Sequence, residues 1–109
     1  MKIEVKDYQG MKVMALSGEI DMYSSPALRE KMMSLVHEKV TPLLVDFKGV
    51  PYIDSSGIAT FVEGLKCMIS YGGRLKLIGL LEGVREIFSF SKLDTIFEIY
   101  ETFEDALDS

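Results

Sequence analysis

Four small polar residues, Asp54-Ser55-Ser56-Gly57, form the segment of this sequence whose side chains could do chemistry. A nearly continuous apolar run from Leu43 to Phe47 precedes them, and an amphipathic stretch begins near Ile58. This order predicts a buried strand, a polar corner and then a helix. The first turn of a helix has unpaired amide groups and favours negative charge, so a hydroxyl there is well placed to carry a phosphoryl group.

The plainer interpretation of the same corner is helix capping. Serine is a preferred N-cap residue, so Ser55 and Ser56 could do no more than begin the helix. Asp54 would then be an ordinary acidic residue beside a helix N-terminus. The four residues alone do not decide between capping and phosphorylation.

Catalytic alternatives find little support in the sequence. A serine hydrolase needs a base near Ser55, but the one histidine is His37 and there is no Gly-x-Ser-x-Gly motif. One histidine and one cysteine, Cys67, supply no spacing for a metal site, and no Gly-x-x-x-x-Gly-Lys loop is present. A phosphoaspartate receiver would use Asp54 or Asp46, but such a domain does not begin with a hairpin. We therefore expect a protein that is not an enzyme, with no catalytic residues, metal or cofactor.

Composition bounds the remaining classes. A chain of 109 residues with 48% hydrophobic residues fits one compact domain, residues 1–109, with a real core. The net charge of −5 argues against nucleic acid or an anionic membrane as partner. The single cysteine suits a reducing compartment, and neither a signal peptide nor a membrane-spanning run is recognisable. We expect a cytoplasmic protein.

Periodicity predicts nine elements in the order β-β-α-β-α-β-α-β-α. Strands at residues 3–5 and 12–16 flank a turn at Gln9-Gly10, and a helix with Ser25 as its N-cap ends before Pro42. Strands at 43–47, 74–78 and 96–100 alternate with further helices, the last capped by Thr102. On the helix after the corner, the expected buried stripe is Ile58, Phe61, Val62, Leu65 and Ile69, with Glu63 and Lys66 as a surface pair.

This alternation predicts an α/β fold with a mixed, mostly parallel central sheet of about five strands and about four helices. Functional sites in such sheets gather where strands end and helices begin. Two places meet that condition, the loop from Gly18 to Tyr23 and the corner from Asp54 to Gly57.

At this point a family resemblance becomes specific. It rests on Leu16-Ser17-Gly18-Glu19-Ile20-Asp21, an apolar strand ending near Asp46, Tyr52-Ile53-Asp54-Ser55-Ser56-Gly57, and Gly72-Gly73 before a strand. In this order the segments resemble the STAS domain, and within it the anti-sigma factor antagonists of bacteria. The resemblance runs from the first strand to Ala106-Leu107 and so covers essentially the whole chain.

The resemblance implies partner switching. In that family the unphosphorylated antagonist binds an anti-sigma factor, which is also a serine kinase, and the sigma factor is released. The kinase phosphorylates the first serine of the motif, here Ser55, and binding is lost until a PP2C-type phosphatase removes the phosphate. The family also implies a free monomer, with helices mainly on one side of the sheet.

The resemblance also assigns roles to residues of this chain. Ser55 becomes the phosphoacceptor, Ser56 the better capping candidate, and Gly57 a point of close backbone approach. The expected partner-binding residues are Asp21, Met22, Tyr23, Asp54, Ser56, Gly57 and Ile58. The runner-up is a STAS interaction module that does not switch, either a scaffold of a stress-signalling complex or the cytoplasmic subunit of a lipid transporter. The retained motif favours the antagonist.

Overall fold

The computed structural model describes all residues from Met1 to Ser109 and places the strands in one five-stranded sheet of order β1-β2-β3-β4-β5. β1 and β2 form an antiparallel hairpin, and β2, β3, β4 and β5 run parallel to one another. This arrangement confirms the predicted mixed, mostly parallel sheet. The elements, in chain order, are β1 (Lys2–Tyr8), β2 (Met11–Ser17), α1 (Ser25–His37), β3 (Leu43–Gly49), α2 (Ser55–Ile69), β4 (Leu75–Ile78), α3 (Glu82–Phe90), the 3-10 helix η1 (Leu93–Thr95), β5 (Glu98–Tyr100) and α4 (Phe103–Leu107).

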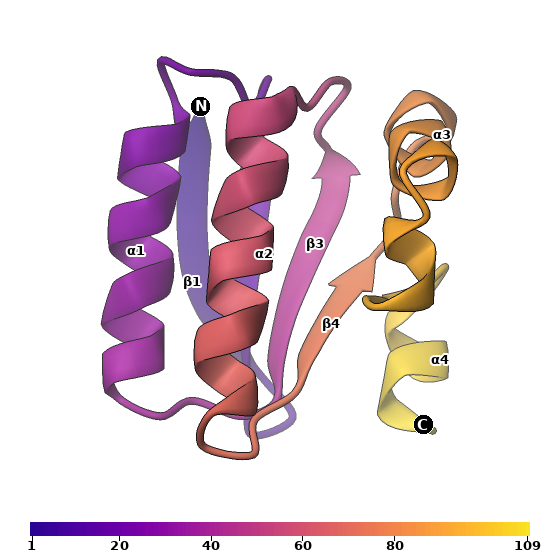
Figure 1. The fold of residues 1–109 in the computed structure, drawn as a ribbon. Coiled ribbons are helices and arrows are strands. Elements are labelled where there is room, and N and C mark those ends of the chain that lie inside the picture. Colours follow the sequence, from indigo (N-terminus) through magenta and orange to yellow (C-terminus); the bar gives the residue numbers. More distant parts are fainter.

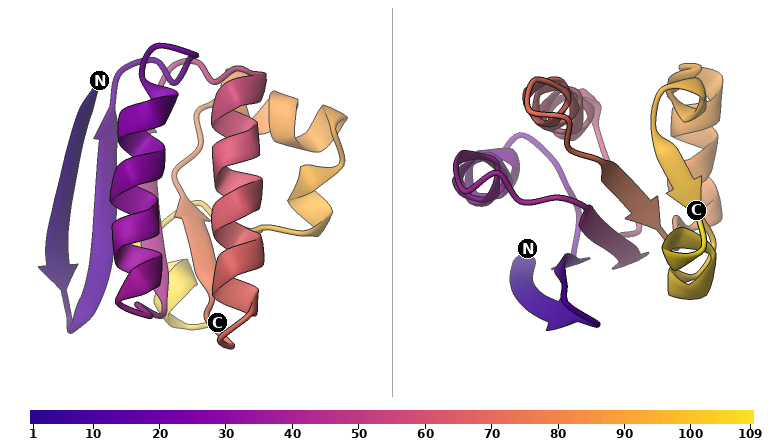
Figure 2. Two further views of the ribbon diagram at one scale, coloured as in Figure 1. Left: turned by 60° about the vertical axis from the view of Figure 1, so that its left-hand side comes forward. Right: turned by 90° about the horizontal axis from the view of Figure 1, so that it is seen from below.

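Three helices cover one face of the sheet, and α4 lies against the other (Figures 1 and 2). The alternation of side chains along each strand decides which residues reach which face. On β3, Leu43, Val45 and Phe47 enter the larger core beneath α1, α2 and α3, while Leu44 joins the smaller core beneath α4. β3 is thus buried on both faces, as its apolar run predicts.

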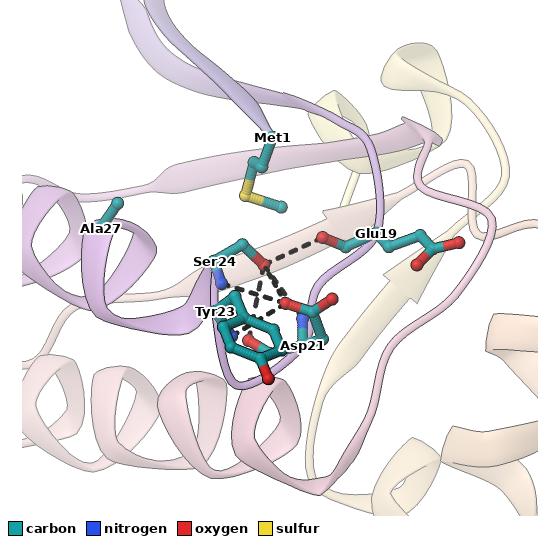
Figure 3. A pocket seen from close by; sticks show the side chains of 6 residues that line it. All are labelled: Met1, Glu19, Asp21, Tyr23, Ser24 and Ala27. Atoms are coloured by element: carbon teal, nitrogen blue, oxygen red, sulfur yellow. Dashed lines mark hydrogen bonds between the residues drawn. The ribbon is translucent and has the colours of Figure 1, made fainter.

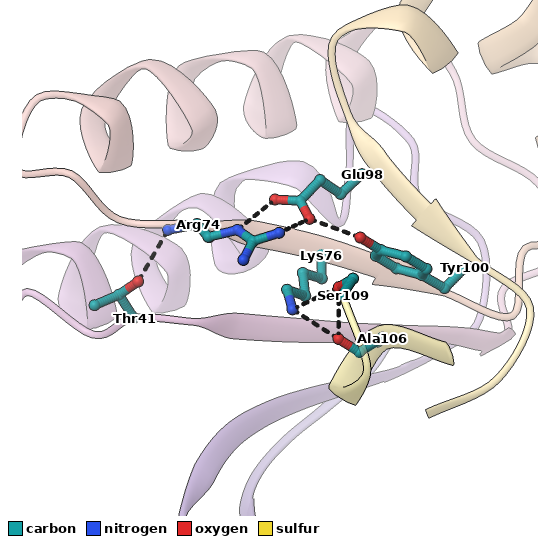
Figure 4. A network of polar contacts seen from close by, with 7 residues as sticks. All are labelled: Thr41, Arg74, Lys76, Glu98, Tyr100, Ala106 and Ser109. Carbon is teal, nitrogen blue, oxygen red and sulfur yellow. Dashed lines mark hydrogen bonds and ion pairs between the residues drawn. The ribbon is translucent and has the colours of Figure 1, made fainter. Parts of the chain in front are cut away.

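The small core under α4 contains a buried cation. Lys76 on β4 is only 5% exposed, and its Nζ donates to the carbonyl of Ala106 at 2.7 Å and to Ser109 Oγ at 3.0 Å (Figure 4). A cation is favoured beside the C-terminal carbonyls of a helix. Lys76 therefore ties α4 to the sheet.

At the edge of the sheet, Arg74 pairs with Glu98 through two hydrogen bonds, and Tyr100 donates to the same carboxylate (Figure 4). These bonds lower the pKa of Glu98, the one to Arg74 most strongly. They join the start of β4 to β5, which is only three residues long.

The buried face of α2 agrees with most of the predicted stripe: Phe61 is buried, and Ile58, Val62 and Leu65 pack against the main core. Ile69 is the exception, since it is 62% exposed. The buried face also includes small residues, because glycine lets α1 approach closely: a Cβ on Gly64 would overlap the sulfur of Met32. The predicted surface pair of Glu63 and Lys66 is wrong. Glu63 instead accepts two hydrogen bonds from Arg29 of α1, each 2.7 Å.

Candidate functional site

Backbone hydrogen bonds join the two polar loops at the carboxyl edge of the sheet. Ile20 forms an isolated parallel bridge with Ile53: its amide donates to the Tyr52 carbonyl at 2.9 Å, and its carbonyl accepts from the Asp54 amide at 3.0 Å. Both isoleucine side chains are buried, at 0% and 1% exposure. The loop after β2 and the corner after β3, 31 or more residues apart along the chain, therefore form one surface.

Asp54 is the N-cap of α2. One oxygen, Oδ1, accepts from the amides of Ser56 at 2.9 Å and Gly57 at 3.2 Å, and from the Ser56 hydroxyl at 2.6 Å. The bond from that hydroxyl is the main cause of the lowered pKa of Asp54, and the amides of Gly57, Ser56 and Met22 lower it further. The capping role predicted for Ser56 is wrong: a carboxylate one residue before the helix reaches the first-turn amides better than a hydroxyl already inside it.

Ser56 instead links the two helices that begin at this edge. Its Oγ lies 2.8 Å from Oγ of Ser25, and the Ser25 hydroxyl is 2.6 Å from the carbonyl of Asp21, to which it donates. Ser25 is 7% exposed. The prediction that Ser25 caps α1 is wrong by one residue, because Ser24 occupies the N-cap position and Ser25 is the first residue of the helix.

Ser55 stands apart from this network. It is the first residue of α2 and is exposed, while Ser56 beside it is half-buried. The Ser55 hydroxyl takes part in none of the side-chain hydrogen bonds that fix the corner. Of the two adjacent serines, Ser55 is therefore the one whose hydroxyl an enzyme could reach without first breaking a bond.

Gly57 is buried beneath this surface, whereas Ile58 remains partly exposed. A Cβ on Gly57 would lie 2.5 Å from Cγ2 of Ile20 and 2.7 Å from Cγ1 of Ile53, so the glycine is required for close packing of α2 on the bridged loops. This agrees with the close approach predicted there. Ile58 is half-buried and packs against the main core.

The loop after β2 presents apolar side chains to solvent while its polar groups are bonded internally. Asp21 Oδ1 accepts from the amides of Tyr23 at 2.9 Å and Ser24 at 3.0 Å, an Asx turn that holds the loop. Met22 and Tyr23 are left 66% and 87% exposed. Next to them is a shallow hollow of about 480 Å³, lined by Met1, Glu19, Asp21, Tyr23, Ser24 and Ala27 (Figure 3).

The structure thus brings together most of the residues predicted for the site and adds two. Asp21, Met22, Tyr23, Asp54, Ser55 and Ser56 share one edge, and Ser24 and Ser25 join them. Of these two serines, only Ser25 had a predicted role, as the N-cap of the helix that ends before Pro42. No group of three or more His, Cys, Asp and Glu side chains is arranged to hold a metal ion, and no helix is long and apolar enough to cross a bilayer.

Comparison with known proteins gives this fold and site a family. The family model described as STAS domain matches residues 2–106. Over 99 residues the chain is 36% identical to the anti-sigma-B factor antagonist of Bacillus subtilis (strain 168), covering 91% of this chain and 90% of that protein. The chain therefore belongs to the STAS domain family, and within it to the anti-sigma factor antagonists. Proteins of that class are regulators and not enzymes.

Solved structures agree with the fold. The crystal structure of an anti-sigma factor antagonist from Mycobacterium paratuberculosis superposes with a TM-score of 0.89 at 27% identity, covering 98% of this chain and 91% of that one. The phosphorylated form of the Bacillus cell fate determinant SpoIIAA superposes with a TM-score of 0.75 at 24% identity, covering 98% and 97%.

Proposed function

We propose that this chain is a phosphorylation-controlled antagonist that acts through Ser55. Unphosphorylated, it binds an anti-sigma factor that is also a serine kinase, and the sigma factor is freed. Phosphate on Ser55 ends that binding, and a PP2C-type phosphatase restores it. The observation that carries the proposal is the contrast between the exposed, unbonded hydroxyl of Ser55 and the engaged hydroxyl of Ser56.

The first turn of α2 explains why a phosphate there would act on a partner. The amides of Ser56 and Gly57 are already bonded to Asp54, so they cannot also neutralise a phosphate on Ser55. The added charge of about −1.5 to −2 would remain at the surface beside an ionised carboxylate. A partner docked over Met22 and Tyr23 would have to desolvate that charge, and a loss of about 2–3 kcal/mol weakens binding roughly 30- to 150-fold.

The fold itself has no reason to change. Ser55 is exposed, and the positive end of the α2 dipole favours a negative group at this position. The relative SpoIIAA keeps the same fold in its phosphorylated form. In this proposal the chain works as a single domain and a free monomer in the cytoplasm, with its docking surface at the carboxyl edge of the sheet.

The first test locates the phosphate. The purified chain is incubated with its anti-sigma factor kinase and ATP, and the product is examined by mass spectrometry. One phosphate is expected on Ser55, absent from Ser55→Ala and retained by Ser56→Ala, which leaves the acceptor in place. Phosphate on Ser56, or on neither serine, contradicts the proposal. Binding to transporter subunits in place of a kinase would support the non-switching module.

The second test distinguishes the effect of negative charge at position 55 from the effect of side-chain size on binding. Ser55→Asp is expected to weaken binding of the anti-sigma factor by about 30-fold or more, with an unchanged melting temperature. Ser55→Asn is the matched control because it has nearly the same size and no charge. Equal loss of binding in both variants would show that steric fit, and not charge, decides the interaction.

A further inference from the structure

The outer face of α3 carries an apolar groove that the Ser55 site does not use. Val84 and Phe88 of this helix are buried in the main core. On a neighbouring strip of the helix, Gly83, Ile87 and Phe90 follow each other at helical spacing. Ile87 is half-buried and packs partly against the main core, whereas Phe90 is 93% exposed. With Glu86 and Ser91 these residues line a groove of about 310 Å³, which we call the α3 groove.

Gly83 has no role inside the protein that would require glycine. A Cβ at this position would meet nothing within 4 Å, and the backbone there is not left-handed. Glycine weakens a helix relative to alanine. The absence of a side chain at Gly83 therefore affects the protein surface, where it leaves the α3 groove open.

Charge in the α3 groove points to the chemistry of its occupant. Glu86 lines the groove and belongs to none of the ion pairs of the chain, whereas its neighbour Arg85 pairs with Glu101 at 3.5 Å. A second copy of this chain packed with its α3 antiparallel would bring two Glu86 carboxylates close together, which is unfavourable. A partner with a lysine or arginine in that place would pair with Glu86.

The helix that carries the groove begins at the same edge of the sheet as the proposed docking surface. β3 and β4 are parallel, so α2 and α3, which follow them, both begin at the carboxyl edge of the sheet (Figures 1 and 2). A standard interface covers about 800 Å² of each partner, here roughly an eighth of the total surface of 5996 Å². A protein that covers the Ser55 corner at that size must extend over neighbouring elements.

We propose that the α3 groove is a second contact for the anti-sigma factor. It would receive an amphipathic helix of that protein, with an apolar side chain over Gly83 and against Phe90, and a lysine or arginine opposite Glu86. This inference rests on the proposed function, since it names a further surface for the same partner.

The test uses the full chain and the purified anti-sigma factor, with affinity measured by calorimetry. Gly83→Leu, which fills the groove, and Phe90→Ser, which removes its wall, are each expected to weaken binding about tenfold or more. Glu86→Lys is expected to weaken it as well. The control is Ile69→Ser, at an exposed apolar residue at the far end of α2, and it should bind like the unaltered chain.

Measuring the melting temperature beside the affinity distinguishes a loss of binding from a loss of folding. Gly83→Ala should raise the melting temperature, because alanine favours the helix and meets no neighbour. Gly83→Leu should therefore lose affinity without losing stability, which a merely structural role for Gly83 cannot produce.

The outcomes distinguish the two proposals. If Ser55→Asp abolishes binding but Gly83→Leu and Phe90→Ser bind within twofold of the unaltered chain, the groove proposal is wrong and the switch stands. If Ser55→Asp binds as tightly as the unaltered chain, the switch itself is wrong. If the chain alone dimerises and Phe90→Ser prevents it, the occupant is a second copy and the assignment to the anti-sigma factor is overturned.

Discussion

Replacing Gly57 by alanine tests how the two loops of the site are held together. The new methyl group would lie 2.5 Å from Ile20 Cγ2 and 2.7 Å from Ile53 Cγ1, whereas carbon atoms in contact prefer about 3.5–4.0 Å. Both isoleucines are buried and form the bridge between the loops. Relief of the overlap therefore requires the bridge or α2 to move by about 1 Å.

The size of the effect follows from two opposing contributions. Overpacking a well-filled site costs about 1–3 kcal/mol, and alanine in a helix gains about 0.5–1 kcal/mol over glycine. Because both contacts are shorter than 3.0 Å, the overpacking cost should lie in the upper half of that range, and we expect Gly57→Ala to lower the free energy of unfolding by about 1–2 kcal/mol. Gly83→Ala should raise it by about 0.5–1 kcal/mol, because nothing lies within 4 Å of its added methyl group.

Urea unfolding of both variants followed by circular dichroism measures this pair of opposite changes. The affinity of Gly57→Ala for the anti-sigma factor should also fall, because the displaced bridge carries Asp21, Met22 and Tyr23 on its next residues. A Gly57→Ala variant as stable as the unaltered chain would refute the reasoning, since it would mean that the bridge yields without cost.

Two further predictions concern the polar groups of the site. Ser25→Ala removes the hydroxyl that contacts the Asp21 carbonyl and Ser56 Oγ. The variant should lower the free energy of unfolding, measured by urea titration, by about 1–2 kcal/mol. An unchanged free energy would mean that these contacts contribute nothing to stability. The lowered pKa values of Asp54, Glu63 and Glu98 stabilise the fold above the ordinary carboxyl pKa of about 4, and this contribution is lost as the pH falls through the lowered values. Stability should therefore decline with acid below about pH 4, less steeply in Glu98→Gln, and an equal slope in that variant would contradict the assignment.

The order of elements and the position of the corner could be predicted because both depend on local patterns. Alternation along β1 and the apolar run of β3 are readable over a few residues, and Thr102 caps α4 through the Asp105 amide as its spacing predicts. The residue that caps α2 could not be predicted from the sequence, because aspartate and serine cap helices about equally well. Only the backbone geometry places Asp54, and not Ser56, outside the first turn.

Contacts between distant segments escaped prediction for a different reason. The contact between the Ser25 and Ser56 hydroxyls, 2.8 Å apart, joins residues 31 apart along the chain, and nothing in either local pattern indicates that α1 and α2 begin side by side. The close packing at Gly57 and Gly64 could not be predicted because these residues carry no hydrophobic signal, although both are buried and leave no room for a Cβ. Hydrophobic periodicity finds large side chains and overlooks a face built from small ones.

The identity of the cap changes how a phosphate on Ser55 would act. If a serine capped α2, a phosphate on its neighbour could take over the free amides and be partly neutralised by the protein itself. With Asp54 Oδ1 already bonded to the amides of Ser56 and Gly57, those donors are occupied before the phosphate arrives. The new charge would remain for the partner to accommodate, which is the property that a switch of binding without a change of fold requires.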